Sequence, residues 1–244
     1  MKQTSEKTGD RETHREVAEE CVVPLPDVPH ACERFLDDLA EWAEECIARY
    51  GEAPATDVHD QCTFLTGLQP LLTHRHSPDL LVFFRRMRDR VRAHFADTGQ
   101  WAHGYWRMQE THHGTEHFEL FLGMLLQLDP DDLETRRQLI DAVEHVLAPV
   151  GGVECWFDET TGLFPSVYCG ADGVRREEGP AINVPDHFRW VNLALLAEGA
   201  GGGKEYLQWA AAYARRWAEA ICFTRELPIA LAPGGPLYDL DATD

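Results

Sequence analysis

The segment TEHFELFLGMLLQLDPDDLETRRQLIDAVEHVLA, residues 115–148, decides the fold class. Its first part, up to Leu128, is apolar at nearly every position, which is typical of a helix that its neighbours cover on almost all sides. Asp129-Pro130 then provides a helix start, and apolar residues recur at three- and four-residue steps as far as Ala148. The segment therefore predicts a hairpin of one enclosed helix and one amphipathic helix.

The same alternation recurs on both sides of this hairpin. The expected amphipathic helices cover residues 29–50, 77–96 and 206–222, and the expected apolar helices cover residues 58–72 and 185–196. Apolar helices must be covered by their neighbours. We therefore expect a mainly α fold of antiparallel helical hairpins, arranged as an inner and an outer ring of helices.

Other segments do not follow this alternation of helices. Residues 151–184 contain glycines, prolines and aromatic pairs, which predicts a small β-hairpin excursion, and residues 227–244 are expected to add one strand. The arginine run at 85–92 is typical of a solvent-exposed outer face. Residues 1–24 are charged and poor in large apolar groups, so we expect a disordered or loosely attached arm before one domain over 25–244.

Composition excludes several kinds of partner. The chain has 22 Lys plus Arg against 42 Asp plus Glu, and a net charge of −20 repels nucleic acid and anionic membrane surfaces. No apolar run reaches membrane-spanning length, and the 7 cysteines include no C-x-x-C pair. The glycines at 199–203 lack the context of a dinucleotide-binding loop. We therefore expect a cytoplasmic protein that has reduced thiols, needs no cofactor and binds neither nucleic acid nor membrane.

One short segment resembles a known family. Residues 156–164, WFDETTGLF, look like the D-x-x-T-G-L-[FW] turn of the α/α-toroid carbohydrate enzymes, the six-hairpin glycosidases and polysaccharide lyases. Residues 206–218 are similar to the outer helices of such toroids. The resemblance covers roughly residues 29–240. It implies an (α/α) toroid or partial toroid, little more than half of a six-hairpin ring, and a small-molecule or oligosaccharide substrate.

The densest polar cluster, residues 101–117, lies just before an apolar helix and holds several histidines. Histidine can both accept and donate a proton near neutral pH, and tyrosine can serve as the acid partner. His113 or His117 is the candidate base, Tyr105 the candidate acid, and Glu116 a second carboxylate or orienter. In the structural alternative, the histidines cap this helix and form hydrogen bonds across an aromatic loop.

A second polar cluster, residues 183–192, opens the next apolar helix. His187 is an alternative acid, and Asn183 with Arg189 is a candidate clamp for a substrate carboxylate. Asp186 and Arg189 fall on one helical face, although Asp186 could equally cap its helix and pair with Arg189. The remaining candidates for substrate binding are His103, His112 and the aromatic residues Trp106, Trp156 and Tyr168.

The leading hypothesis is a lyase, hydrolase or epimerase that acts on an oligosaccharide by acid–base chemistry of histidine, tyrosine and carboxylate groups. An isomerase or dehydratase of a small apolar metabolite would add Cys169 to Tyr168 and the histidines. A third class is a non-catalytic binding protein whose exposed apolar edge drives homo-oligomerisation.

A zinc peptidase is the last alternative. His113, Glu116 and His117 match H-x-x-E-H, the inverted zinc-peptidase pattern. A helix that starts at Thr115 leaves His113 outside it and removes the spacing of four residues along one face. We therefore expect no metal site.

Overall fold

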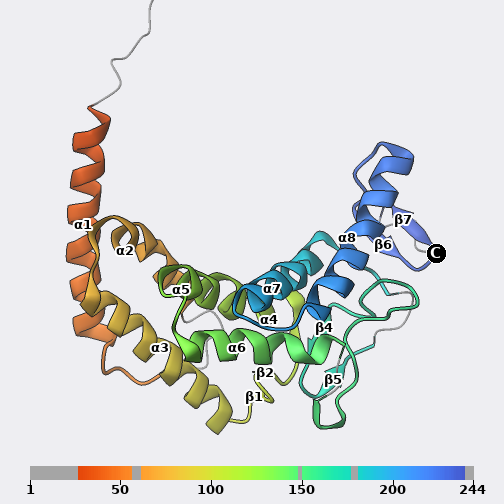
Figure 1. The fold of residues 1–244 in the computed structure, drawn as a ribbon, viewed down its shortest axis with the longest axis horizontal. Helices are drawn as coiled ribbons and strands as arrows, with labels where there is room; N and C mark the ends of the chain where they lie inside the picture. Colours follow the sequence, from red (N-terminus) through yellow and green to blue (C-terminus); the bar gives the residue numbers. More distant parts are fainter. Residues whose placement is uncertain (1–26, 57–61, 148–149, 177–180, 240–244) are drawn as a thin grey trace, which may run out of the picture.

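The computed structural model describes residues 27–56, 62–147, 150–176 and 181–239. These residues are mainly helical, with small antiparallel β-hairpins, as the sequence predicts. The elements follow a curved path, with α1 (Val28–Tyr50) at one end and α8 (Glu205–Thr224) at the other (Figure 1). The predicted arm, residues 1–24, lies outside the described residues.

The described helices lie in the segments where the sequence predicts them, but burial does not separate an enclosed set from an amphipathic one. Besides α1 and α8, the helices in the predicted amphipathic segments are α3 (Pro78–Asp97) and α6 (Leu133–Val143), the latter extended by η3 (Glu144–Val146). The elements in the predicted apolar segments are η1 (Thr63–Leu68) with α2 (Gln69–Arg75), α4 (Thr111–Glu116) with η2 (His117–Leu122) and α5 (Gly123–Leu128), and η5 (Pro185–His187) with α7 (Phe188–Gly199). Most α-helical elements that follow one another in the chain also pack together, α7 with α8 most extensively.

Within the described ranges, three small antiparallel β-elements lie beside the helices. They are the pair β1 (Trp101–Ala102) and β2 (Tyr105–Trp106), the sheet of β3 (Gln109–Glu110), β4 (Tyr168–Gly170) and β5 (Gly173–Val174), and the pair β6 (Ala230–Ala232) and β7 (Gly235–Leu237). The excursion predicted within residues 151–184 is confirmed by β4 and β5. The C-terminal segment forms two strands, where one was expected, because its glycine turn folds the chain back on itself.

Helix α4 begins four residues before the predicted start at Thr115. The N–H of Thr111 donates to the carbonyl of Val167 at 2.6 Å, directly after Glu110 pairs with Tyr168 across β3 and β4. This long-range pairing fixes the helix start. Thr115 is buried and its hydroxyl donates to the carbonyl of Thr111 at 2.7 Å, so Thr115 lies inside the helix and does not cap it.

The arginines of α3 do not form the solvent-exposed face that their spacing predicts. Arg88 is buried and pairs with Asp132 at the start of α6, and Arg85 pairs with Asp129 at the end of α5. Arg90 donates to the carbonyl of Gly51 at 2.7 Å. The arginine run therefore joins α3 to its two neighbouring segments.

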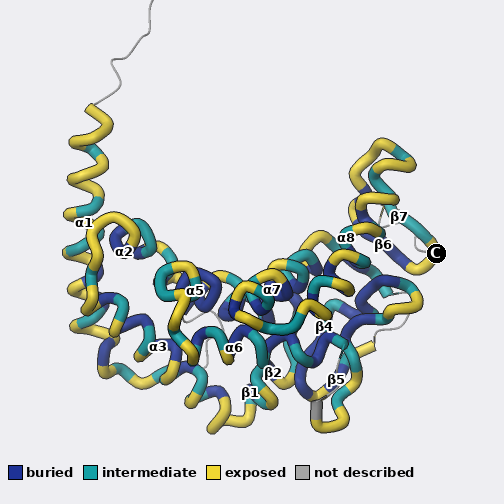
Figure 2. Tube along the Cα trace, viewed as in Figure 1, coloured by how far each residue is buried: buried dark blue, intermediate teal, exposed yellow. Residues whose placement is uncertain are grey.

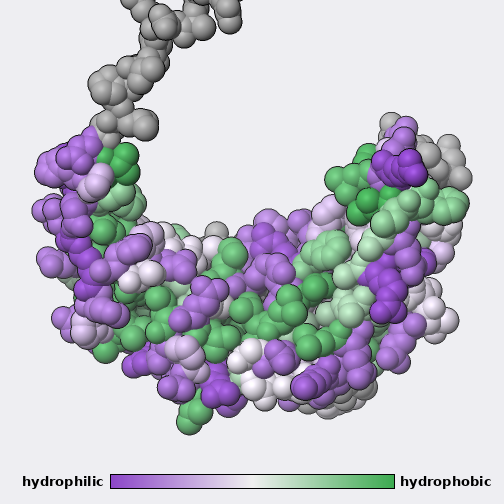
Figure 3. All heavy atoms as spheres, turned by 45° about the horizontal axis from the view of Figure 1, so that its top comes forward, coloured by the Kyte–Doolittle hydropathy of each residue, from purple (hydrophilic) through white to green (hydrophobic). Residues whose placement is uncertain are grey.

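The core occupies the middle of the arc, whereas the first half of α1 and the last turns of α8 contain no buried residue (Figure 2). In the space-filling view, hydrophilic residues gather at the middle of the concave side and apolar residues lie near the ends of both arms (Figure 3). None of the helices in the described ranges combines the length and the apolar character that crossing a bilayer requires.

Candidate functional site

A partly exposed polar cluster joins α4 and η2 to α7. His112, Glu116 and Glu119 lie four and three residues apart, so their side chains share one face of the continuous helix. The Nε2 atom of His112 lies 3.2 Å from Oε1 of Glu116. Glu119 accepts hydrogen bonds from Nη1 of Arg189 at 3.0 Å and from Nδ2 of Asn192 at 2.7 Å. We name these five residues the α4–α7 cluster.

The carboxylates of this cluster are better shielded than its imidazole. The side chains of Glu116 and Glu119 are 14% and 13% exposed, whereas that of His112 is 40% exposed. Charges that are partly removed from water interact more strongly with neighbouring groups. A ligand on this face would therefore meet His112 first, with Glu116 directly behind it.

The π-helix η2 carries Glu119. A π-helical turn is rare, and it appears frequently at functional sites. Here it runs from His117 to Leu122, between the regular helices α4 and α5. The π-helical turn thus contains Glu119, which accepts the hydrogen bonds from Arg189 and Asn192 of α7.

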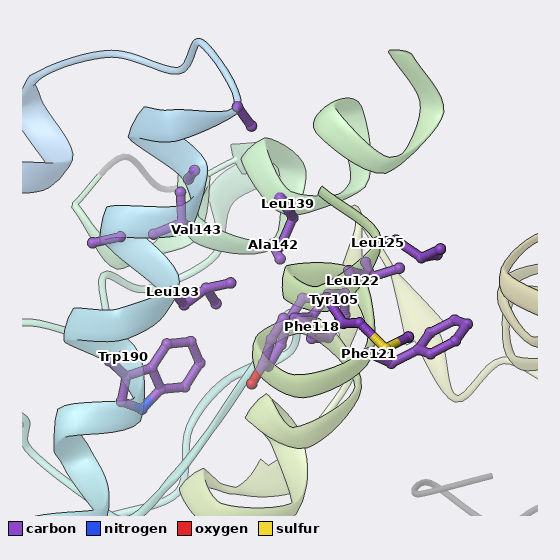
Figure 4. Packing of buried hydrophobic residues seen from close by; sticks show 14 of the residues in the cluster. Tyr105, Phe118, Phe121, Leu122, Leu125, Leu139, Ala142, Val143, Trp190 and Leu193 are labelled. Atoms are coloured by element: carbon purple, nitrogen blue, oxygen red, sulfur yellow. The ribbon is translucent and has the colours of Figure 1, made fainter. Parts of the chain in front are cut away.

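The aromatic core sets the spacing of the two helices. A Cβ atom at Gly114 would lie 2.7 Å from the hydroxyl oxygen of Tyr105, so glycine lets α4 pack directly on that ring. Figure 4 shows Trp190 of α7 and Tyr105 in the same core. Their ring centroids are 5.2 Å apart, and Nε1 of Trp190 donates to Oγ1 of Thr111 at 3.4 Å. The packing of α4 and α7 on these buried rings therefore fixes the spacing between the two helices that carry the α4–α7 cluster.

His117, a predicted base, lies in this core and not at the surface. Its side chain is fully buried among Trp101, Phe118 and Phe121, and neither ring nitrogen has a hydrogen-bond partner within the described ranges. Burial lowers the pKa of His117 to about 3. An enclosed imidazole cannot exchange a proton with a bound oligosaccharide.

The other predicted acids are enclosed as well. Tyr105 is fully buried, and burial raises the pKa of its hydroxyl well above the usual value. His187 is buried between Val184 and Ser166, whose carbonyl lies 3.3 Å from its Nε2, and burial lowers the pKa of His187. Both side chains hold the fold together and leave His112 as the accessible proton-transfer group of the cluster.

Asn183 was predicted to clamp a substrate carboxylate, and the structure gives it other partners. Its Nδ2 donates to the carbonyl of Phe164 at 2.8 Å and its Oδ1 accepts from the N–H of Phe164 at 2.9 Å. Arg189 pairs with Glu119 and not with Asp186, which is exposed. The two residues of the predicted clamp therefore have separate partners: Asn183 binds the backbone of Phe164, and Arg189 belongs to the α4–α7 cluster.

The predicted aromatic walls also belong mostly to the core. Trp106 and Trp156 are buried, and Nε1 of Trp156 donates to the carbonyl of Gly170 at 2.9 Å. Tyr168 is half-buried, with the guanidinium of Arg175 at 3.3 Å from its ring centroid. The exposed His103 lies apart from the cluster, and its carbonyl accepts from Nε2 of His145 at 3.0 Å.

The H-x-x-E-H pattern does not form a metal site in the part of the chain that the structure describes. His113 is partly exposed and lies 3.9 Å from Glu110, whereas His117 points into the core. Within the described ranges, no group of three or more His, Cys, Asp or Glu residues is suited to hold a metal ion. Cys169, named for the isomerase alternative, is buried, and burial raises the pKa of its thiol.

Sequence reasoning missed Glu119 as a functional candidate. The available signal was its spacing of seven and three residues from His112 and Glu116, which places all three on one helical face. The spacing of Arg189 and Asn192 is the matching signal on α7. Comparison with protein-family models, with curated proteins and with solved structures finds no match for this chain.

The buried His117 predicts a measurable loss of stability in acid. Its folded pKa of about 3 lies below the unfolded value of about 6.5, so the unfolded chain binds the proton first. The part of the free energy of unfolding that depends on neutral His117 is therefore fully present above about pH 6.5 and declines as the pH falls toward 3. Between about pH 7.5 and pH 5, this residue should cost about 2 kcal/mol of the free energy of unfolding.

Urea unfolding of His117→Leu and of the unchanged protein at both pH values measures this cost. The variant should lose about 2 kcal/mol less on acidification, because His145 and His187, whose pKa values are also lowered, remain in both proteins. An equal loss in the two proteins would show that His117 does not carry the effect.

Proposed function

We propose that this chain is an α/α-toroid type of glycoside hydrolase that acts on neutral oligosaccharides through the α4–α7 cluster. The proposal for the fold is that η1 with α2, α4 with η2 and α5, and η5 with α7 form an inner layer and that α1, α3, α6 and α8 form an outer layer, together about half of a ring. It is supported by the alternation of apolar and amphipathic segments along the sequence and by the D-x-x-T-G-L-F turn at residues 158–164.

The observation that carries the proposal is that the His112–Glu116 pair shares a helical face with Glu119, whose carboxylate accepts hydrogen bonds from Arg189 and Asn192. Glycoside hydrolysis requires one group that protonates the leaving oxygen and one carboxylate that stabilises positive charge at the sugar ring or activates water. We assign proton transfer to His112 with Glu116. We assign charge stabilisation to Glu119, whose orientation Arg189 and Asn192 restrict.

The charge of the site favours a neutral sugar over a uronide. The α4–α7 cluster holds two carboxylates, those of Glu116 and Glu119, and one guanidinium, that of Arg189, so its formal charge is 1 − 2 = −1 with a neutral His112. Arg189 is already paired with Glu119. An anionic substrate would be repelled by this site and by the net charge of −20.

The test is release of reducing ends from a panel of neutral oligosaccharides built from glucose, xylose and mannose. Glu116→Gln should lower kcat by at least about 100-fold, because acid–base groups contribute roughly 10²–10⁴-fold. The matched control is Glu198→Gln, further along α7 and outside the cluster, which should keep kcat within about twofold.

Two results would overturn the proposal. One is the absence of turnover with every neutral oligosaccharide of the panel. The other is an unsaturated product from a uronide, because elimination and not hydrolysis forms such a product. A thermal melt of Glu116→Gln that matches the unchanged protein ensures that lost turnover reflects chemistry and not unfolding.

A further inference from the structure

An open crevice at the α1 end of the arc lies between the last turns of α1 and the 3-10 helix η1. It encloses about 250 Å³ and is lined by Trp42, Glu45, Cys46, Arg49, Tyr50 and Phe64. Trp42, Tyr50 and Phe64 are 41%, 37% and 45% exposed. Aromatic side chains normally bury most of their surface, so three partly exposed rings around one crevice indicate a surface prepared for a ligand.

The rings and the rim of this aromatic crevice are chemically different. Tyr50 and Phe64 pack edge to face with centroids 6.3 Å apart, which fixes two walls. Glu45 and Arg49 are exposed and lie one turn apart on α1. Neither residue forms an ion pair within the described ranges. Their hydrogen-bonding groups are therefore available to a ligand that has apolar faces and polar edges.

We propose that the aromatic crevice binds one pyranose ring of an oligosaccharide. The C–H faces of a sugar ring pack on aromatic rings, and its hydroxyl groups can form hydrogen bonds with Glu45 and Arg49. Pockets for drug-sized ligands measure roughly 300–1,000 Å³, so about 250 Å³ suits a single ring. An apolar peptide side chain would cover the same rings but would offer no hydroxyl groups to the two charged residues at the rim.

The choice of a sugar rests on the proposed function, whereas the crevice itself does not depend on it. The crevice is formed by α1 and η1, and none of its lining residues belongs to the α4–α7 cluster. Binding at the crevice and turnover at the cluster can therefore be measured separately. The crevice would hold part of a long substrate or anchor the protein to a polysaccharide.

The experiment is isothermal titration of the full chain with neutral hexasaccharides built from glucose, xylose and mannose, with Glu116→Gln as the background to prevent turnover. Trp42→Ala should weaken binding of the preferred hexasaccharide by about 10-fold, the effect of losing an aromatic contact of about 1–1.5 kcal/mol. The matched control is Phe35→Ala. Phe35 is also exposed on α1, at 56%, but it does not line the crevice.

Retention of affinity in Phe35→Ala with loss in Trp42→Ala supports the site. Equal affinity in Trp42→Ala and the background protein, or binding of none of the hexasaccharides, overturns it. If Trp42→Ala melts at a lower temperature, Glu45→Gln at the exposed rim provides the second variant, with an expected loss of about threefold. Turnover without crevice binding would contradict only this inference, and crevice binding without turnover would contradict only the proposed function.

Discussion

Replacing Arg88 with methionine is expected to cost about 3–5 kcal/mol of the free energy of unfolding. The Arg88 side chain is 5% exposed and pairs with Asp132, whose side chain is 15% exposed. It also donates to Oδ1 of Asp89 and to Oγ1 of Thr135, both at 2.8 Å. Methionine keeps the apolar stem but leaves the shielded carboxylate of Asp132 without its cation, and an uncompensated buried charge is costly.

Urea unfolding measures this loss, with Arg86→Met as the matched control on the same helix. Arg86 is 45% exposed and its partner Glu52 is 92% exposed, so its loss should cost about 0–1 kcal/mol. The double variant Arg88→Met/Asp132→Asn should recover part of the loss, because it removes both charges. Equal stability of Arg88→Met and Arg86→Met would show that the buried pair does not hold α3 to α6.

The arginines of α3 also show which part of the fold the sequence can predict. Three- and four-residue periodicity correctly predicts helices such as α3, which Ser77 caps by accepting from the N–H of Leu80 at 3.3 Å through its Oγ. Periodicity describes one helix at a time, however. It cannot show that the acidic residues of the turn between α5 and α6 lie opposite Arg85 and Arg88, because each of these contacts spans 44 residues of chain.

The candidate site was only partly predictable for a related reason. The polar segment around residues 101–117 was identified, but histidine content does not separate an exposed imidazole from an enclosed one. His117 lies on the same helical face as Phe121, whereas His112 shares a face with Glu116 and Glu119. Placing the helix start at Thr115 left His112 outside the helix. The β3–β4 pairing that fixes the true start at Thr111 joins residues far apart in the sequence.

Replacing Trp190 with alanine should remove about 3–5 kcal/mol of stability and disrupt the α4–α7 cluster at the same time. The Trp190 ring is fully buried, with its centroid 4.8 Å from that of Trp156 and 5.2 Å from that of Tyr105. Alanine would leave a cavity between α4 and α7 and remove the hydrogen bond to Thr111. Urea unfolding measures the loss of stability, and oligosaccharide turnover measures the loss of the site.

The matched control is Leu195→Ala on the same helix. Leu195 is 54% exposed, so its truncation should change stability by about 0.5–1 kcal/mol and leave turnover intact. Trp190→Phe should restore part of the lost stability, because it refills part of the cavity without supplying the indole N–H. If Trp190→Ala lost stability but retained full turnover, the α4–α7 cluster would not depend on the core beneath it.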